Sequence, residues 1–324
     1  MPEWLCEEGI GENRAILLEA GEIVEAAIEL PGLRAGAIVP ARLTRILIAC
    51  RRGLATLEGG TEAIVEPIPK GLTEGAAFRA EILREPIPEA GRPKLAKARA
   101  SEAEVRPGPT LFDRLGRCAR LTPFDSDRFE QAGWSELLGE AGRGEIAFPG
   151  GALRMSVTPA MTLFDVDGSL PLAELAIAGA TAAARAIRRF GIGGSIGVDL
   201  PTVPDRTVRQ KAAEAVDAIL PQPFERTAVN GFGFLQIVRR RERPSLPELF
   251  QADPAGAAAR ALLRRAQRAP GHGPLTLHAA PGVIAGVESI PGWREAIERV
   301  AGAAVALQAE PGLAISASHV HRAH

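Results

Sequence analysis

The stretch EIAFPGGALRMSVTPAMTLFDVDGS, residues 145–169, decides how the chain is expected to fold. Its three short apolar runs are separated by turns rich in Pro and Gly, which predicts three consecutive strands. The next segment, 170–190, is rich in Ala, has apolar residues at helical spacing and ends in a basic turn, as an α-helix does. A glycine-rich turn then leads into SIGVDL (195–200), which reads as a buried strand. Three strands, a helix and a further strand predict an α/β unit with a mixed sheet.

The segments on either side of residues 145–200 indicate further structural domains. Short β-type runs at close spacing fill residues 14–99 and are typical of a small barrel or sandwich. A helix is expected at 205–219, followed by a strand that ends in an arginine cluster. We therefore divide the chain into N-terminal strands at 1–35, a barrel at 36–100, an irregular connector with one short helix near 129–138 at 101–143, a central α/β unit at 144–250, and a small C-terminal α/β domain at 251–324.

Composition limits the classes of function. The 324 residues are 46% hydrophobic and 24% charged, which suits two or three globular domains and excludes a mainly disordered chain. The net charge of -1 hides a division, because residues 1–31 hold one basic and eight acidic residues, whereas 32–100 hold twelve basic and seven acidic ones. Separate modules with different partners explain this division, and so does chance variation on solvated surfaces. No apolar run approaches the ~20 residues of a spanning helix and no leader pattern is present, so we expect no membrane partner.

The numbers and positions of cysteine, histidine and aromatic residues further limit the possible functions. Cys6, Cys50 and Cys118 lie far apart without a CxxC pair, so we expect no disulfide framework, no zinc site and a cytoplasmic location. Tyr is absent and aromatic residues make up 4%, which limits base stacking. The histidines lack metal-ligand spacing, the last three lie at a terminus expected to fray, and none is expected to act in catalysis. They are His272, His278, His319, His321 and His324.

Three aspartates near strand ends are the strongest candidates for chemistry. Asp165 and Asp167 in FDVDGS share one face, because side chains of a strand repeat every second residue. Asp199 ends the strand after the helix and would approach Asp165 if the two strands were neighbours. Such carboxylates are hard oxygen ligands for Mg²⁺, which can activate water and neutralise charge on a phosphodiester. The alternative is that these aspartates begin turns or cap helices.

Two basic groups are candidates for phosphate contact. The arginine run that includes Arg239 and Arg241 could hold phosphate bidentately, or could be a charged edge strand that blocks aggregation. The segment GRPKLAKAR (91–99) forms a basic stripe of the kind that follows a nucleic-acid backbone, through Arg92, Lys94, Lys97 and Arg99. The run GIGGSIG (191–197) follows a helix and precedes a strand, which is the reverse of a dinucleotide-binding loop, so that function is rejected.

These blocks resemble the ribonuclease E/G family of bacterial endoribonucleases. The resemblance is strongest in EIAFPGGALRMSVTPAMTLFDVDGS, FGIGGSIGVDL and NGFGFLQIVRRRERPSL, which occur in the family's order. ENRAILLEAGEIVEAAIE resembles its opening strands, and the segment from AGAIVPARLTRI to GRPKLAKAR resembles its inserted RNA-binding barrel. The C-terminal segment from PLTLHAAPGVIAGV to WREAIERVAGAAVAL resembles the small C-terminal domain of the family more loosely. The resemblance implies an α/β (α+β) fold with an RNase H-like nuclease core, an inserted OB-fold barrel and a small C-terminal domain.

The resemblance also implies an activity, namely Mg²⁺-dependent hydrolysis of single-stranded RNA, with Mn²⁺ as a substitute ion. Asp165 and Asp199 match the two family aspartates that bind the metal. Asp167 replaces a family Asn that orients water or the scissile phosphate, and the added charge would either tighten the metal or repel phosphate. The RNA backbone would be held by Arg239, Arg241 and the stripe of Arg92, Lys94, Lys97 and Arg99.

Several departures from the family pattern keep other functions open. The connector is too short for the family's 5′-monophosphate sensor, and no cysteine pair follows PSL to form its zinc link. The barrel has GLATLEGGTEAIVEP where the family has aromatic residues, and Thr202 stands near a further family Asp. The resemblance implies a homodimer formed through the small C-terminal domain, and it implies no zinc link between protomers. The alternatives are a catalytically weak or inactive RNA-binding or scaffold relative, and a structural α/β protein without RNA affinity.

Overall fold

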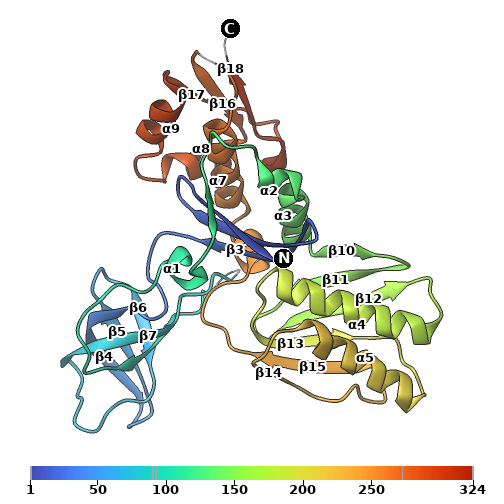
Figure 1. The fold of residues 1–324 in the computed structure, drawn as a ribbon. Coiled ribbons are helices and arrows are strands. Elements are labelled where there is room, and N and C mark those ends of the chain that lie inside the picture. Colours follow the sequence, from blue (N-terminus) through green and yellow to red (C-terminus); the bar gives the residue numbers. More distant parts are fainter. Residues whose placement is uncertain (1, 90, 92, 272, 323–324) are drawn as a thin grey trace. The chain divides into compact units, whose positions relative to one another are not determined.

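The computed structural model describes residues 2–89, 91, 93–271 and 273–322, and none of the helices found there is long and apolar enough to cross a membrane. The chain is a mixed α+β protein with three sheets and a closed barrel (Figure 1). Its contacts form two compact units. The first contains residues 1–31, 115–142 and 249–324, and the second contains residues 32–114 and 143–248.

The barrel lies in the second unit, within the predicted range 36–100. Its strands close in the order β4-β5-β6-β8-β7. They are β4 (Ile38–Ile48), β5 (Arg52–Leu57), β6 (Glu62–Val65), β7 (Ala77–Arg84) and β8 (Ala96–Ala100). Many of the buried side chains in its core are alanines, including Ala63, Ala80 and Ala96. Small side chains suit the narrow interior of a five-stranded barrel, and the expectation of a barrel is confirmed.

The second unit also contains a six-stranded sheet, in the order β10-β11-β12-β13-β15-β14. Its strands are β10 (Glu145–Phe148), β11 (Gly151–Val157), β12 (Thr162–Gly168), β13 (Gly194–Asp199), β14 (Phe224–Arg226) and β15 (Phe234–Arg239). Only β12 and β13 pair in parallel, through the crossover that contains α4 (Leu172–Arg189). This is the mixed strand–strand–strand–helix–strand unit expected from residues 145–200.

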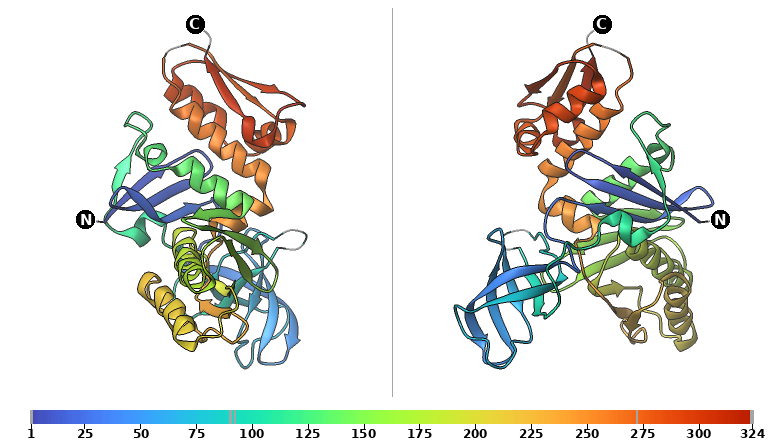
Figure 2. Two further views of the ribbon diagram at one scale, coloured as in Figure 1. Left: turned by 90° about the vertical axis from the view of Figure 1, so that its right-hand side faces the viewer. Right: turned by 60° about the vertical axis from the view of Figure 1, so that its left-hand side comes forward.

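Helices cover one face of this sheet and leave the other open. Helix α4 and the neighbouring α5 (Arg206–Ile219) lie on the same side (Figures 1 and 2). The buried side chains of β12 and β13, such as Phe164 and Val198, point to that side. Helix α4 comes close at Gly179, where an added Cβ would lie 2.4 Å from a Cγ of Val166. Alternate residues of the strands therefore project from the open face.

The first unit begins with a four-stranded sheet in the order β3-β2-β1-β9. Its strands are β1 (Glu3–Glu8), β2 (Asn13–Glu19), β3 (Glu22–Glu29) and β9 (Ala119–Leu121). The segment 101–143 is helical near 129–138, as expected, in α2 (Arg128–Gln131) and α3 (Trp134–Arg143). The prediction that the rest is irregular is wrong in detail, since it also contains α1 (Leu111–Leu115) and β9. Burial of Phe129 and Trp134 orders α2 and α3, although each is too short to give a strong periodic pattern.

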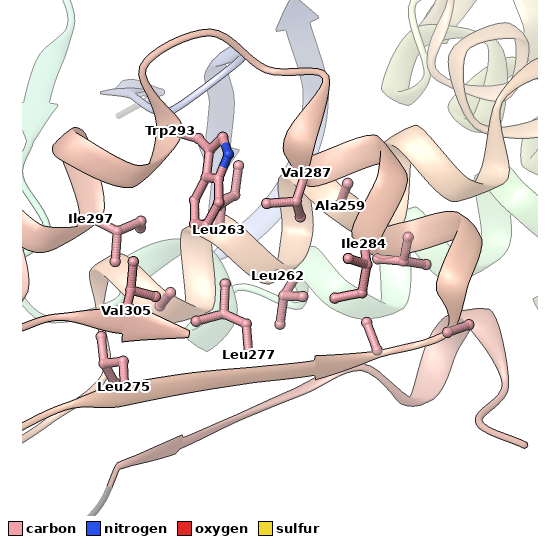
Figure 3. Packing of buried hydrophobic residues seen from close by; sticks show 14 residues of the cluster. Ala259, Leu262, Leu263, Leu275, Leu277, Ile284, Val287, Trp293, Ile297 and Val305 are labelled. Atoms are coloured by element: carbon pink, nitrogen blue, oxygen red, sulfur yellow. The ribbon is translucent and has the colours of Figure 1, made fainter. Parts of the chain in front are cut away.

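The C-terminal part of the first unit has a three-stranded sheet in the order β17-β16-β18. Helix α6 (Leu246–Ala252) spans the boundary between the units in the sequence, and the elements that follow it are α7 (Pro254–Gln267), β16 (Leu275–Ala279), α8 (Pro281–Glu288), α9 (Trp293–Ala301), β17 (Val305–Ala309), the 3₁₀ turn η1 (Ile315–Ala317) and β18 (His319–Arg322). Figure 3 shows side chains of helices and strands meeting in the core, among them Leu263, Leu277 and Trp293. The prediction of a frayed terminus is wrong for His319 and His321, because their strand pairs with β16.

The cysteine prediction is also wrong. Cys6 and Cys118 form a disulfide of 2.00 Å, and Cys50 is free and exposed. Strand β9 pairs in parallel with β1, with Leu5 opposite Ala119, which brings the two cysteines together across a sequence separation of 112. That pairing is nonlocal, so cysteine spacing alone does not reveal it.

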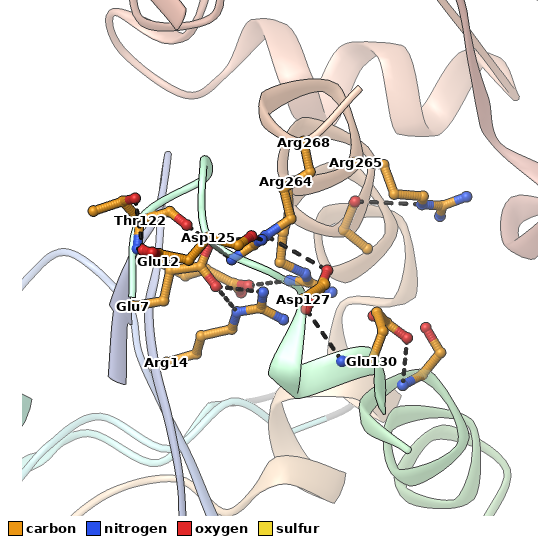
Figure 4. Close-up of polar contacts among 12 residues, drawn as sticks. Glu7, Glu12, Arg14, Thr122, Asp125, Asp127, Glu130, Arg264, Arg265 and Arg268 are labelled. Carbon is orange, nitrogen blue, oxygen red and sulfur yellow. Dashed lines mark hydrogen bonds and ion pairs between the residues drawn. The ribbon is translucent and has the colours of Figure 1, made fainter. Parts of the chain in front are cut away.

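A buried network of ion pairs lies in the first unit (Figure 4). Glu7 is only 2% exposed, and one of its oxygens accepts hydrogen bonds from Arg14 at 2.5 and 3.0 Å. The other oxygen accepts from Arg268 at 3.0 Å. The Arg14 guanidinium also lies over the rings of Phe129 and Trp134, at 4.1 and 5.2 Å from their centroids. Burial lowers the pKa of Arg14 to about 10.

Candidate functional site

A row of side chains crosses the open face of the six-stranded sheet. Strand pairing places Glu145 opposite Arg154, and Arg154 opposite Asp165. Asp165 is in turn opposite Asp199, which is opposite Phe234. Neighbouring strands are about 5 Å apart, so the two aspartates lie as close as adjacent strands allow. The condition for their approach, that β12 and β13 are neighbours, is met.

Among the described residues, the carboxylates of Asp165 and Asp199 have no partner. Both residues are exposed, and within the described residues no hydrogen bond or ion pair engages either carboxylate. By contrast, Asp217 on the neighbouring helix α5 accepts a hydrogen bond from Arg226 at 2.7 Å. Like charges directly opposite each other destabilise a sheet. Two facing negative charges therefore do not stabilise the fold, so stability does not explain their placement. A cation bound between them would explain it.

Asp167 lies on the same face, two residues further along β12. One of its carboxylate oxygens is 3.7 Å from Nη1 of Arg154, and both side chains are largely exposed. Thr202, near the position of a further family aspartate, donates a hydrogen bond from Oγ1 to the carbonyl of Phe232 at 3.1 Å. Asp167 therefore points toward Arg154. The Thr202 hydroxyl contacts the turn that contains Phe232, next to this row of side chains.

The number of carboxylates at this site, which is two, bears on which metal ion it could bind. In the described part of the chain, no set of three or more His, Cys, Asp or Glu side chains could hold a metal ion. Mg²⁺ is the divalent ion least dependent on a protein cage, because it keeps several waters and binds through one or two carboxylates together with substrate phosphates. The donor set of Asp165 and Asp199 therefore fits Mg²⁺ completed by water and substrate.

The predicted arginines lie away from the carboxylate pair. Arg239 to Arg243 line a pocket of about 320 Å³ with Gly191, Gly193 and residues 221–223. Arg239 is opposite Gly194, five residues along β13 from Asp199, a separation of about 17 Å at ~3.3 Å per residue. Arg239 donates to the carbonyl of Ile192 at 3.1 Å, and Arg241 pairs with Glu248. The arginines therefore lie at the end of the β13–β15 strand pair that is opposite to the end with Asp199.

The basic stripe of the barrel is charge-paired. Lys94 pairs with Glu89, Lys97 lies 3.3 Å from Glu66, and Arg99 lies 2.8 Å from Glu81. Hydrogen bonds from Lys97 and Arg52 hold the pKa of Glu66 below its usual value. Arg92 lies outside the described residues. Neighbouring carboxylates therefore offset much of the positive charge that the sequence pattern indicated.

One aromatic side chain near the carboxylates was missed. Phe232 is 82% exposed and lies in the turn that enters β15. Asn230 Oδ1 accepts hydrogen bonds from the backbone N–H groups of Phe232 and Phe234 at 2.9 and 3.0 Å, which fixes this turn. The overall scarcity of aromatic residues hid it, although an aromatic flanked by glycines after Asn-Gly in NGFGF is a local signal of an exposed turn.

Comparison with known proteins adds no relative to this description. No protein-family model matches the chain, and no curated protein matches it. The carboxylate pair and the sequence blocks quoted above are therefore what point to a function.

Proposed function

We propose that the chain is a Mg²⁺-dependent endoribonuclease of the ribonuclease E/G type that hydrolyses single-stranded RNA. The observation that carries this proposal is the facing, unpartnered pair of Asp165 and Asp199 on an open sheet face. The resemblance independently selects the same two positions as metal ligands. As part of the proposal, the closed barrel is an OB fold and the six-stranded sheet belongs to an RNase H-like nuclease core.

The residues of the row take distinct parts in this proposal. Asp165 and Asp199 would hold Mg²⁺, which supplies an acidified water and neutralises charge on the phosphodiester. Arg154, next to Asp165 in the row, offers a guanidinium to a phosphate oxygen. Asp167 would position a water and, through its contact with Arg154, would position that guanidinium.

Contacts to the RNA backbone complete the proposal. A single strand that crosses the open face along β13 would pass from the carboxylate pair toward the exposed Arg240 at the far end of the sheet. Alternation along β15 puts Arg239 on the helix-covered face, so Arg239 would contact phosphate only at that sheet end, where it lines the same pocket as Arg240. Arg241 is tied to Glu248, so its part is to shape that pocket. Lys94, Lys97 and Arg99 exchange carboxylate partners for phosphates when RNA binds. Such contacts are electrostatic, so affinity should fall steeply with salt.

Replacement of one carboxylate tests the proposal. Asp165→Asn and Asp199→Asn should each lower the rate of Mg²⁺-dependent cleavage of a fluorescent single-stranded RNA by at least about 100-fold, because each removes a charged ligand. Gel separation of the products over time measures the rate. Glu225→Gln is the matched control, since it removes one exposed carboxylate from β14 of the same sheet and should leave the rate unchanged.

The same experiment separates the proposal from its alternative. Equal rates in the wild type and Asp165→Asn would reject the metal-site assignment and indicate a contaminating nuclease. Salt-sensitive RNA binding without any product at saturating Mg²⁺ or Mn²⁺ would favour an inactive RNA-binding relative.

Phe232 provides a second prediction about RNA. Stacking of a base on an exposed aromatic ring contributes about 1–3 kcal/mol, so Phe232→Ala should raise the Kd for single-stranded RNA by about 5- to 160-fold. Phe232→Trp should keep the affinity. Fluorescence anisotropy measures Kd, with Phe124→Ala as control because Phe124 is equally exposed at 83% and lies in the first unit. Equal losses in the two alanine variants would exclude a specific stacking role.

A further inference from the structure

Three histidines gather on the open face of the small C-terminal sheet. Leu275, Leu277 and Ala279 of β16 point into the core, so His278 projects from the opposite face. Pairing with β18 places His319 directly opposite His278, and His321 two residues further along the same face. His278 is half-buried, whereas His319 and His321 are exposed. Residues more than forty positions apart in sequence thus form one cluster.

The spacing of the rings is close to that of imidazoles that share a tetrahedral ion. The ring centroid of His278 lies 4.8 Å from that of His319 and 6.5 Å from that of His321. Two imidazoles bound to one Zn²⁺ at ~2.0–2.1 Å have centroids about 5 Å apart. The backbone therefore already brings the rings of His319 and His321 within about 1.5 Å of the required separation from the ring of His278.

A carboxylate orients the least exposed of the three rings. Nδ1 of His278 lies 2.6 Å from Oε1 of Glu310, a residue that directly follows β17. Metal-binding histidines commonly donate one ring N–H to a carboxylate, which fixes the tautomer and makes the other nitrogen a better ligand. Glu310 thus leaves Nε2 of His278 as the nitrogen available to a ligand.

We propose that His278, His319 and His321 form a binding site for a borderline divalent transition metal such as Zn²⁺, with Glu310 as the positioning residue. Imidazole nitrogens select Zn²⁺, Ni²⁺ or Cu²⁺ over Mg²⁺. This site belongs to the first unit and uses imidazole ligands, whereas the carboxylate pair belongs to the second unit, and the site does not depend on the proposed ribonuclease activity.

Metal binding requires one rearrangement. His278 and His319 are stacked in parallel, with 3° between their planes, and in the described residues no three ligating side chains yet converge on one point. Rotation of the exposed His319 and His321 side chains turns a nitrogen of each toward Nε2 of His278, and water takes the fourth position. The site is therefore assembled by the metal.

Competition against a fluorescent zinc chelator tests the site. The full chain is used in a Cys50→Ser background, which removes the exposed free thiol, and in excess Mg²⁺ to occupy hard oxygen ligands. Zn²⁺ alone is the probe. We expect one Zn²⁺ per chain, and visible absorption typical of tetrahedral coordination when Co²⁺ replaces it. Glu310→Gln should weaken binding by about 10- to 100-fold, because it removes the carboxylate that orients His278.

Variants of the exposed ligands decide the outcome without threatening the fold. His319→Ala and His321→Ala should each weaken Zn²⁺ binding more than Glu310→Gln does, while Gln308→Ala, on the strand next to His278, should leave it unchanged. Zn²⁺ affinity that is equal in the wild type and both histidine variants would overturn the proposal. So would the absence of a one-to-one Zn²⁺ complex in the parent protein.

Discussion

Reduction of the Cys6–Cys118 bond should lower the free energy of unfolding of the first unit by about 4–5 kcal/mol. The bond closes a loop across a sequence separation of 112, and cross-links that close loops of roughly this length restrict the unfolded chain by about that free energy. Strand β9 has only three residues and its pairing with β1 covers three positions, so the disulfide adds a covalent link where the strand pairing is short. Trp4, Trp134 and Trp293 all lie in the first unit, so urea unfolding followed by tryptophan fluorescence reports on it.

The remaining cysteine supplies the control. Cys50→Ser removes a free, exposed thiol and should leave the unfolding midpoint unchanged. The Cys6→Ser/Cys118→Ser double variant should match the reduced wild type and should not respond to reductant. An unchanged midpoint in that double variant would show that β1 and β9 are held by their pairing alone.

Helices and strands with a clear local sequence pattern were predicted correctly. The helix expected at 170–190 is observed as Leu172–Arg189, and the helix expected at 205–219 as Arg206–Ile219. Both have the spacing of one apolar face over three or more turns, which is the strongest local signal. The strands at 145–168 were predicted for a similar reason, since Pro and Gly turns separate their apolar runs.

Pairings between distant segments were not predictable in the same way. The disulfide depends on β1 lying beside β9, and the histidine cluster depends on β18 pairing with β16. Neither leaves a local pattern, so the cysteines were expected to be unpaired and the histidines to be unconnected. The expectation of a reducing compartment relied on unpaired cysteines, and the disulfide removes that basis.

The candidate site was predictable in part. The approach of Asp199 to Asp165 required only that two strands joined by a helix be neighbours, which is the usual result of such a crossover. The sequence could not show that both carboxylates lack partners among the described residues, or that Arg239 lies at the other end of the β13–β15 pair from Asp199. Those properties depend on register and on the side chains that surround each charge.

Glu7→Gln should destabilise the first unit by about 3–5 kcal/mol, because removal of one member of a buried ion pair leaves an uncompensated charge. Arg14 would lose its carboxylate partner while it remains buried against Phe129 and Trp134. Burial already lowers the pKa of Arg14 to about 10, which indicates how poorly its surroundings replace water. Arg268 would suffer less, since it also contacts Asp127 at 3.5 Å and the carbonyl of Asp125 at 3.0 Å.

A second ion pair on the same strand gives the matched control. Glu3 bonds Arg128 at 2.7 Å on the surface, so Glu3→Gln should cost less than about 1 kcal/mol. The Glu7→Met/Arg14→Met double variant should be more stable than Glu7→Gln, because it removes both buried charges and keeps apolar volume. Urea unfolding of the four proteins measures these differences. If Glu7→Gln and Glu3→Gln cost the same, water reaches Arg14, and the network is not a buried one.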